Sequence, residues 1–207
     1  MHSTRSNIIR GIPLARKGSK YVATAMRFSK STVPVVIAVR DMLNLASTMK
    51  EVKQMVHDKM LKINGKFVRD IHQPIPIFGV FQADKSYKIS IKPTGRFELE
   101  ETSDATRIVK VIGKTVVWNG DVQYNLHDGT NIISKEKINV GDSLVVDFEN
   151  KIKKHLTVEK GKKVFVISGS NIGESGAITS VDGNNVAIKL HEKKEAIVLD
   201  KAQIIVQ

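Results

Sequence analysis

The spacing of apolar residues changes twice along the 207-residue chain. Residues 1–33 show neither a helical nor a strand period, whereas residues 34–59 place apolar side chains at the spacing of helices. From Leu61 onward the apolar residues fall in short runs that turn residues separate. This order predicts an α+β fold that is mostly β, with two short helices followed by many short strands.

The second of the two predicted helices has the clearer signal. Thr48 and Glu51 have the T-x-x-E spacing of a capping box, and an apolar stripe begins at Val52. The first segment, 34–43, is ambiguous because four of its residues are β-branched, which favours a strand. Pro34 at its start favours a helix, because proline is common in a first helical turn.

The strand region begins with a hairpin signal. Asn64-Gly65 lies between the apolar runs 61–63 and 67–68, and this dipeptide is typical of a two-residue hairpin turn. Further turn signals follow at regular intervals, which predicts small antiparallel barrels rather than a parallel α/β sheet. Later strands are predicted at residues 75–81, 87–91, 108–112, 115–118, 122–126, 144–148, 163–167, 177–181, 185–190 and 196–199.

These changes of pattern divide the chain into four parts. We predict a basic N-terminal arm over residues 1–33, a helix-and-hairpin module over 34–95, a central β module over 96–157 and a C-terminal β module over 158–207. The arm is rich in Arg, Lys, Ser and Gly, and such a segment buries too little apolar surface to fold alone. We therefore expect it to become ordered only against a partner.

The positive charge is concentrated at the start of the chain. Residues 1–70 contain 14 Lys and Arg and 4 Asp and Glu, so they carry a net charge of +10 out of +12 for the whole chain. A concentrated cationic region is typical of a polyanion-binding surface, because each phosphate it neutralises releases counterions. The alternatives are a solvated tail and a basic helix on a membrane surface. Gly11, Pro13 and Gly18 disfavour the membrane helix because they interrupt a long amphipathic face.

The rest of the composition narrows the mode of recognition. Aromatic residues make up only 5% of the chain, so we expect contacts with phosphates, 2′-hydroxyls and RNA shape rather than bases stacked on aromatic rings. The chain has no cysteine and no run of 18 uncharged apolar residues. We expect a cytoplasmic protein without disulfides, thiolate metal sites or a membrane-spanning helix.

No motif for catalysis or cofactor binding is present. The six histidines lack the spacing of metal ligands. His127 lies beside Asp128, as in half of a catalytic triad, but no nucleophile in a strained elbow accompanies the pair. The glycine-rich segment 169–176 lacks the Gly-Lys-Ser/Thr end of a phosphate-binding loop. We expect no enzyme activity, no cofactor and no small-molecule substrate.

The candidate RNA-binding residues are the cations of the arm and those around the Asn64-Gly65 turn. The alternative for the turn is an ordinary solvated hairpin, and the acid-free arm beside it favours phosphate binding. We expect Asn64 to serve the turn first and RNA second. The full set is Arg16, Lys17, Lys20, Arg27 and Lys30 in the arm, and Arg40, Lys50, Lys53, Lys59, Lys62, Asn64, Lys66 and Arg69 after it.

Two segments resemble known RNA-associated motifs. Residues 42–47, 52–56 and 60–68, the last reading M-L-K-I-N-G-K-F-V, resemble the αL RNA-binding motif of two helices and a V-x-V-N-G-x-x-V hairpin. That motif occurs in ribosomal proteins, tRNA synthetases and pseudouridine synthases. Residues 164–181, beginning V-F-V-I-S-G, resemble a KOW motif, which implies an SH3-like barrel.

The order of the segments is more specific than either motif. R-K-G-S-K-Y-V at 16–22, V-R-D at 39–41, N-L-H-D-G-T-N at 125–131 and V-G-D-S-L at 140–144 together resemble the archaeal and eukaryotic small-ribosomal-subunit protein family S4e. The resemblance covers residues 12–207 and implies the arm, the αL module, a central β module and a KOW module. It also implies binding to small-subunit ribosomal RNA, contact with neighbouring ribosomal proteins, and a role in subunit assembly and translation.

Two departures and two rival interpretations accompany this resemblance. Residues 1–11 lack the basic opening expected of the family, and Met49 and Lys50 replace its commoner helix residues. An RNA-modifying enzyme with an αL domain would need a further catalytic domain. The predicted small barrels already account for the rest of the chain, so no residues remain for such a domain. A KOW-bearing transcription factor would carry less charge in its arm.

Overall fold

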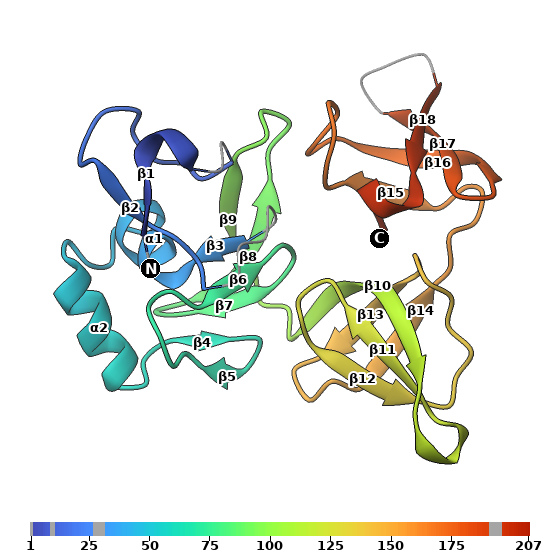
Figure 1. The fold of residues 1–207 in the computed structure, drawn as a ribbon, viewed down its shortest axis with the longest axis horizontal. Coiled ribbons are helices and arrows are strands. Elements are labelled where there is room, and N and C mark those ends of the chain that lie inside the picture. The colour runs from blue at the N-terminus through green and yellow to red at the C-terminus, as the bar shows by residue number, and fades with distance from the viewer. Residues whose placement is uncertain (1, 9–10, 27–31, 191–195) are drawn as a thin grey trace. The chain divides into compact units, whose positions relative to one another are not determined.

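The computed structural model describes residues 2–8, 11–26, 32–190 and 196–207. The chain forms two compact units, Met1–Ala105 and Thr106–Gln207, and each is described by itself (Figure 1). Strands dominate both units, as predicted, and the α-helices lie in the first. No helix in the described part of the chain is long and apolar enough to cross a membrane. The finer division at residues 33, 95 and 157 stays a prediction.

The first residues are folded, contrary to our expectation for the arm. Strand β1 (His2–Thr4) pairs antiparallel with β2 (Tyr21–Ala23), and a short 3-10 turn, η1 (Arg5–Asn7), follows β1. Val22 and Ile12 are only 6% and 7% exposed.

Backbone hydrogen bonds attach this segment to the rest of the first unit. The Phe97 amide donates to the Gly11 carbonyl at 2.8 Å, and the Met26 amide donates to the His72 carbonyl at 2.8 Å. The prediction that residues 1–33 order only against a partner is therefore wrong for the described part of the segment. Single apolar residues and long-range backbone pairing hold it, and neither produces a local periodic pattern.

The ambiguous segment 34–43 is helical. Strand β3 (Thr32–Pro34) pairs with β6 (Pro74–Pro76), and α1 (Val35–Ile37) then continues into a π-helical turn, η2 (Ala38–Met42). Residues 35–39 are fully buried, so their β-branched side chains fill the core on all sides of the helix. Burial therefore outweighs the intrinsic strand preference of the segment.

Helix α2 (Met49–His57) begins at the predicted capping box. The Glu51 amide donates to Thr48 Oγ1 at 3.3 Å, and the Thr48 amide donates to the Glu51 carboxylate at 3.4 Å. Hydrogen bonds from the Ser47 amide and then from Thr48 lower the pKa of Glu51. Val52 is fully buried, and Lys50 and Lys53 are exposed.

The main sheet of the first unit is antiparallel, in the order β5-β4-β7-β8-β9. The predicted hairpin is confirmed, because Asn64 and Gly65 take φ values of 50° and 78° between β4 and β5. The single strand predicted over 75–81 is wrong: Phe78 has a φ of 57° and splits it into β6 and β7. The strands are β4 (Lys62–Ile63), β5 (Lys66–Phe67), β7 (Val80–Gln82), β8 (Ser86–Ile91) and β9 (Phe97–Glu101).

The second unit begins with an antiparallel sheet in the order β12-β11-β10-β13-β14. The two strands predicted over 108–112 and 115–118 are one long strand, with a bulge between Val111 and Gly113. The bulge divides the ladder, so the start of this strand pairs with β13 and its end with β11. The strands are β10 (Thr106–Val116), β11 (Val122–Leu126), β12 (Asn131–Ser134), β13 (Ser143–Asp147) and β14 (Ile152–Leu156).

The second sheet of this unit has the order β18-β17-β16-β15-β19. Its last strand, which we did not predict, pairs with β15 and brings the C-terminal apolar residues into the core. A 3-10 turn, η4 (Lys201–Gln203), precedes it. The strands are β15 (Lys163–Val166), β16 (Ser175–Asp182), β17 (Asn185–Leu190), β18 (Ala196–Asp200) and β19 (Ile204–Val206).

Lys110 joins the two sheets of the second unit. Its ammonium group donates to the carbonyl of Lys201 and, at 2.8 Å, to that of Ile204. The Val206 amide adds a hydrogen bond of 3.0 Å to Ser143 Oγ. Burial lowers the pKa of Lys110 from its ordinary value to about 8.

Candidate nucleic-acid interface

A groove in the first unit lies between the end of α2 and the β4–β5 hairpin. It has a volume of about 990 Å³. Three of the residues that line it, Lys59, Lys66 and Arg69, are cationic. Its walls are formed by Met26, Val56, His57, Lys59, Gly65, Lys66, Phe67, Val68, Arg69, Asp70 and Gln73.

The end of α2 places Lys59 at the edge of the groove. Lys59 has a left-handed backbone with a φ of 56°, and its amide donates to the Val56 carbonyl at 3.1 Å. The Met60 amide donates to the Met55 carbonyl at 3.0 Å. These two bonds satisfy helix carbonyls at the C-terminus and turn the chain toward β4.

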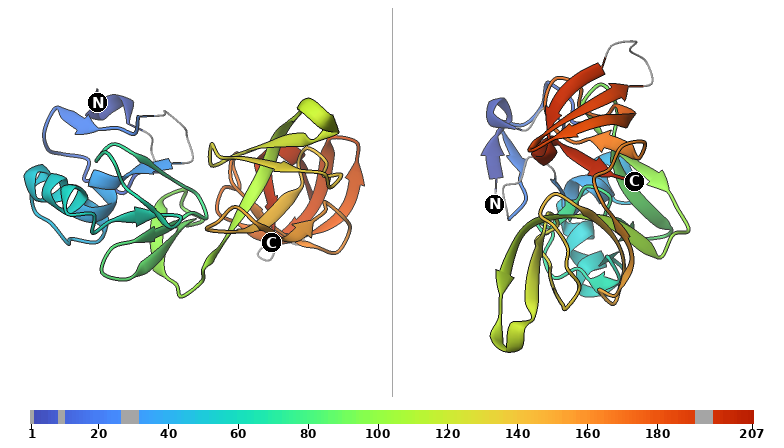
Figure 2. Two further views of the ribbon diagram at one scale, coloured as in Figure 1. Left: turned by 90° about the horizontal axis from the view of Figure 1, so that it is seen from below. Right: turned by 90° about the vertical axis from the view of Figure 1, so that its right-hand side faces the viewer.

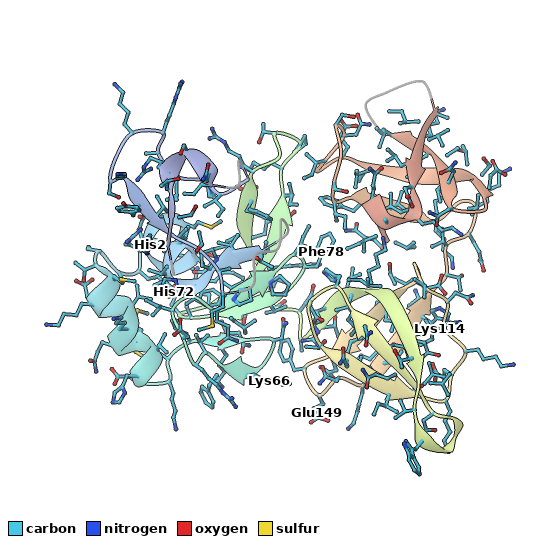
Figure 3. All side chains as sticks on the ribbon, in the orientation of Figure 1. His2, Lys66, His72, Phe78, Lys114 and Glu149 are labelled. Carbon is cyan, nitrogen blue, oxygen red and sulfur yellow. The ribbon has the colours of Figure 1, made fainter. Side chains whose placement is uncertain are left out.

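The β4–β5 hairpin supplies the opposite wall. Lys62 pairs with Phe67 and Ile63 with Lys66 in its short ladder. The Lys62 ammonium lies 4.8 Å from the centre of the Phe67 ring, which is a cation–π distance. Lys66, labelled in Figure 3, is exposed beside the turn.

Phe67 is a functional candidate that the sequence analysis missed. We expected RNA contacts without stacking on aromatic rings, yet Phe67 is 48% exposed. The signal in the sequence that could have identified Phe67 was its position across the hairpin from Lys62. Two-residue strands offer too short an alternation to show which side chain faces solvent.

Asn64 is a structural residue of the hairpin. Its side-chain Oδ1 accepts a hydrogen bond of 2.9 Å from the Val80 amide, and its own amide donates to the Val80 carbonyl at 2.8 Å. The side chain is only 6% exposed. These bonds fix the turn against β7, and RNA contact by Asn64 stays a prediction.

The predicted cations of α2 and the hairpin region have no acidic partners. In the described part of the chain, no carboxylate forms an ion pair with these cations. The nearby acids have other hydrogen-bond partners: Asp58 accepts from Gln54, and Asp70 accepts from the His72 amide. The cations are Lys50, Lys53, Lys59, Lys62, Lys66 and Arg69.

Of the predicted residues that the structure describes, only Lys59, Lys66 and Arg69 line this groove. Arg40 is half-buried, and its guanidinium donates to the Asp41 carboxylate at 2.8 Å. It lines a separate cavity of about 440 Å³, together with His2, Arg5 and Tyr21. Arg27 and Lys30 lie outside the described residues.

Three predicted cations of the arm are exposed on one ordered loop. Arg5 closes this loop, because its guanidinium donates to the Ser19 carbonyl at 2.9 Å and to the Ala15 carbonyl. Arg16, Lys17 and Lys20 lie on the loop and are exposed.

The segment around His127 is structural. The His127 Nδ1 accepts a hydrogen bond of 3.0 Å from the Lys110 amide. Asp128 is buried beside Arg107, with 3.3 Å between the charged atoms, and it also accepts from Thr130. These partners fix a turn of the central sheet. Among the described residues there is no cluster of three side chains able to hold a metal ion.

Comparison with known proteins decides the family. A sequence model of ribosomal family S4e matches residues 83–153. The small ribosomal subunit protein eS4 of Methanocella arvoryzae is 31% identical over 188 residues, which cover 87% of this chain and 80% of that protein. The chain belongs to the S4e family of ribosomal proteins.

Other S4e proteins extend this result. The eS4 protein of Archaeoglobus fulgidus is 32% identical over 187 residues, covering 87% of this chain and 80% of that protein. The crystal structure of the S4e protein from Thermoplasma acidophilum has the same fold, with a TM-score of 0.72 over 85% of this chain and 94% of that one. Its sequence identity is 23%.

The comparisons confirm three predictions. The family resemblance is confirmed, and so is a mostly β fold with few helices. Because S4e is a family of ribosomal proteins, the chain is a structural component and not an enzyme. The same result sets aside the interpretations as an RNA-modifying enzyme and as a transcription factor.

Proposed function

We propose that this protein is a structural constituent of the small ribosomal subunit and binds its ribosomal RNA through the groove between α2 and the β4–β5 hairpin. The observation that carries the proposal is that Lys59, Lys66 and Arg69 line the groove, are exposed, and form no ion pair in the described part of the chain. Relatives that carry the name small ribosomal subunit protein support the same assignment. Its place is then in the cytoplasmic ribosome, among ribosomal RNA and neighbouring ribosomal proteins, where it supports assembly and translation.

The groove suits the sugar–phosphate backbone of structured RNA. Lys59, Lys66 and Arg69 line it and neutralise phosphates, which contributes most of the affinity and a strong salt dependence. Phe67 adds an exposed ring that can pack on a ribose or a base. The cation–π contact holds Lys62 near this ring and reduces the entropy that its side chain loses on binding.

The ordered arm forms a second group of contacts. Arg16, Lys17 and Lys20 lie on the loop that Arg5 closes. Hydrogen bonds already hold this loop in place. The entropy lost when it binds RNA is therefore smaller than for a disordered tail. The proposal also includes the assignment of an αL module and a KOW module to this chain. It further includes RNA contacts by Arg27, Lys30 and Asn64.

The test compares two sets of four charges. One variant replaces Lys59, Lys62, Lys66 and Arg69 with glutamine. The control replaces four exposed cations of the second unit that form no ion pair in the described part of the chain. These are Lys154, Lys160, Lys163 and Lys189.

Both variants remove the same charge, and circular dichroism checks that both fold. We expect the groove variant to lower the slope of log K against log salt by about three for small-subunit ribosomal RNA. The control should change this slope little. Equal slopes for the two folded variants would contradict the assignment of the groove.

A further inference from the structure

The β10–β11 hairpin of the second unit extends beyond its core (Figures 1 and 2). In its ladder Lys114 pairs with Tyr124, and Val116 pairs with Val122. Tyr124 is 1% exposed, whereas Val116, next along the same face, is 74% exposed. Strand β10 therefore leaves the core beyond Lys114 and continues into solvent. Lys114 is labelled on this hairpin in Figure 3.

The extension continues the apolar face of the core. Side chains two positions apart lie on the same face of a strand, so Val116 and Val122 share the face of buried Tyr124. Val122 still packs against the core, and Val116 opposite it does not. The short turn η3 (Trp118–Gly120) ends the hairpin, and Trp118 is 90% exposed there.

The hairpin has no net charge, and in this respect it differs from the groove. Residues 112–122 contain one cation, Lys114, and one anion, Asp121. Asp121 lies 4.0 Å from the Lys135 ammonium. Affinity for RNA comes mainly from cations that neutralise phosphates, and this segment offers no excess of them.

Its composition matches the core of a protein–protein interface. Such cores are depleted in charged residues and enriched in tryptophan, which often contributes most of the binding energy. Exposed valine and tryptophan side chains at a projecting tip fit an apolar pocket and gain from the removal of water. We propose that the hairpin inserts Trp118 into an apolar pocket of a neighbouring ribosomal protein in the small subunit.

This inference rests on the proposed ribosomal function, and a cross-linking experiment tests it. The chain has no cysteine, so Trp118→Cys creates a single thiol that a benzophenone maleimide can label. The labelled full chain is incorporated into small subunits and irradiated, and the product is digested with ribonuclease or protease. Ser180→Cys, an exposed position in β16, is the matched control.

The expected product is an adduct with a ribosomal protein that resists ribonuclease and forms only within the subunit. An adduct that ribonuclease releases, a dimer that the free chain also forms, or no adduct at all would each overturn the inference. A labelled chain that does not sediment with small subunits contradicts the proposed function, and the inference with it. A chain that sediments normally but cross-links only to RNA contradicts the inference alone.

A second variant measures how much the contact contributes. Trp118→Ser should reduce retention of the chain in the subunit at least ten-fold, because an interface tryptophan is often a hot spot. This loss should not depend on salt, unlike the loss caused by the groove variant. Trp118→Phe should restore most of the retention. Full retention of the serine variant would overturn the inference, and circular dichroism of the free chain confirms folding.

Discussion

The two units of the chain use cationic side chains in different ways. The first unit holds 18 Lys and Arg against 9 Asp and Glu. The cations that line its groove, Lys59, Lys66 and Arg69, are exposed and form no ion pair within the described residues. The second unit holds 15 against 12, and two of the cations that the structure describes there are buried. Arg107 and Lys110 are 2% and 5% exposed and have oxygen partners inside the fold. Burial and partners, rather than residue type, therefore decide whether a cation is available to a binding partner or stabilises the fold.

Arg107 should show the largest effect of this contrast. Its guanidinium donates to Asn150 Oδ1 at 2.7 Å and lies beside the Asp128 carboxylate, so Arg107→Leu leaves the buried Asp128 charge without its cationic partner. Breaking a buried ion pair from one side lowers the free energy of unfolding by about 3–5 kcal/mol. Urea unfolding followed by circular dichroism measures the loss.

Lys59→Gln in the first unit is the matched control for Arg107. It removes an exposed cation, and we expect it to change the free energy of unfolding by less than about 0.5 kcal/mol. If the two variants lowered stability equally, the proposed contrast between exposed and buried cations would be wrong.

Lys110 should make the stability of the second unit depend on pH. Its pKa is about 8 in the folded chain and 10.5 as the ordinary value. Between these values the unfolded chain keeps a proton that the folded chain has released, so stability rises with pH across this window. Below pH 8 the penalty for burying the charge is fully present.

The measurement compares the parent with Lys110→Met, which removes the titrating amine and its two hydrogen bonds. We expect the stability of the parent, relative to the variant, to rise by about 3 kcal/mol between pH 7 and 11, from about 1.4 kcal/mol per unit of pKa difference. A neutral amine still has two hydrogens, so both carbonyl contacts can persist above pH 8. A stability difference that stays constant with pH would contradict the depressed pKa.

Local signals in the sequence predicted local structure well. The Thr48–Glu51 capping box and the Asn64-Gly65 turn depend on neighbouring residues only, and both are present. The break at Phe78 could not be predicted, because a left-handed φ at an aromatic residue has no local signature and arises from packing. The ordered arm was missed for a related reason: its contacts, such as Gly11 with Phe97, join residues far apart in the sequence.

The candidate site was predicted in the same uneven way. Counting charges selected the cations of α2 and the hairpin, because lysines around a turn can be expected at the surface without knowledge of the tertiary structure. It also selected Arg40, whose guanidinium is engaged by Asp41 in another cavity. Phe67 was missed, since exposure is a property of the folded surface.

Substitution of Arg5 should give the smallest loss of stability. It is also the sharpest test of the contrast, because Arg5 is a structural cation in the same unit as the exposed groove cations. Its guanidinium donates to the Ser19 carbonyl at 2.9 Å, and its amide donates to the Lys20 carbonyl at 2.9 Å. Arg5→Met removes the side-chain bonds and keeps the backbone bond. We expect a loss of about 1 kcal/mol in the free energy of unfolding.

Hydrogen exchange separates a local effect from a global one at this position. Loss of the Arg5 side-chain bonds should speed exchange at the Tyr21–Ala23 amides, while amides of the β8 strand keep their protection. Lys17→Gln is the matched control, because Lys17 is exposed on the same loop. It should weaken RNA binding and leave both exchange and stability unchanged. If Arg5→Met behaved like Lys17→Gln, Arg5 would be one more surface cation, and hydrogen bonds elsewhere would have to hold the loop.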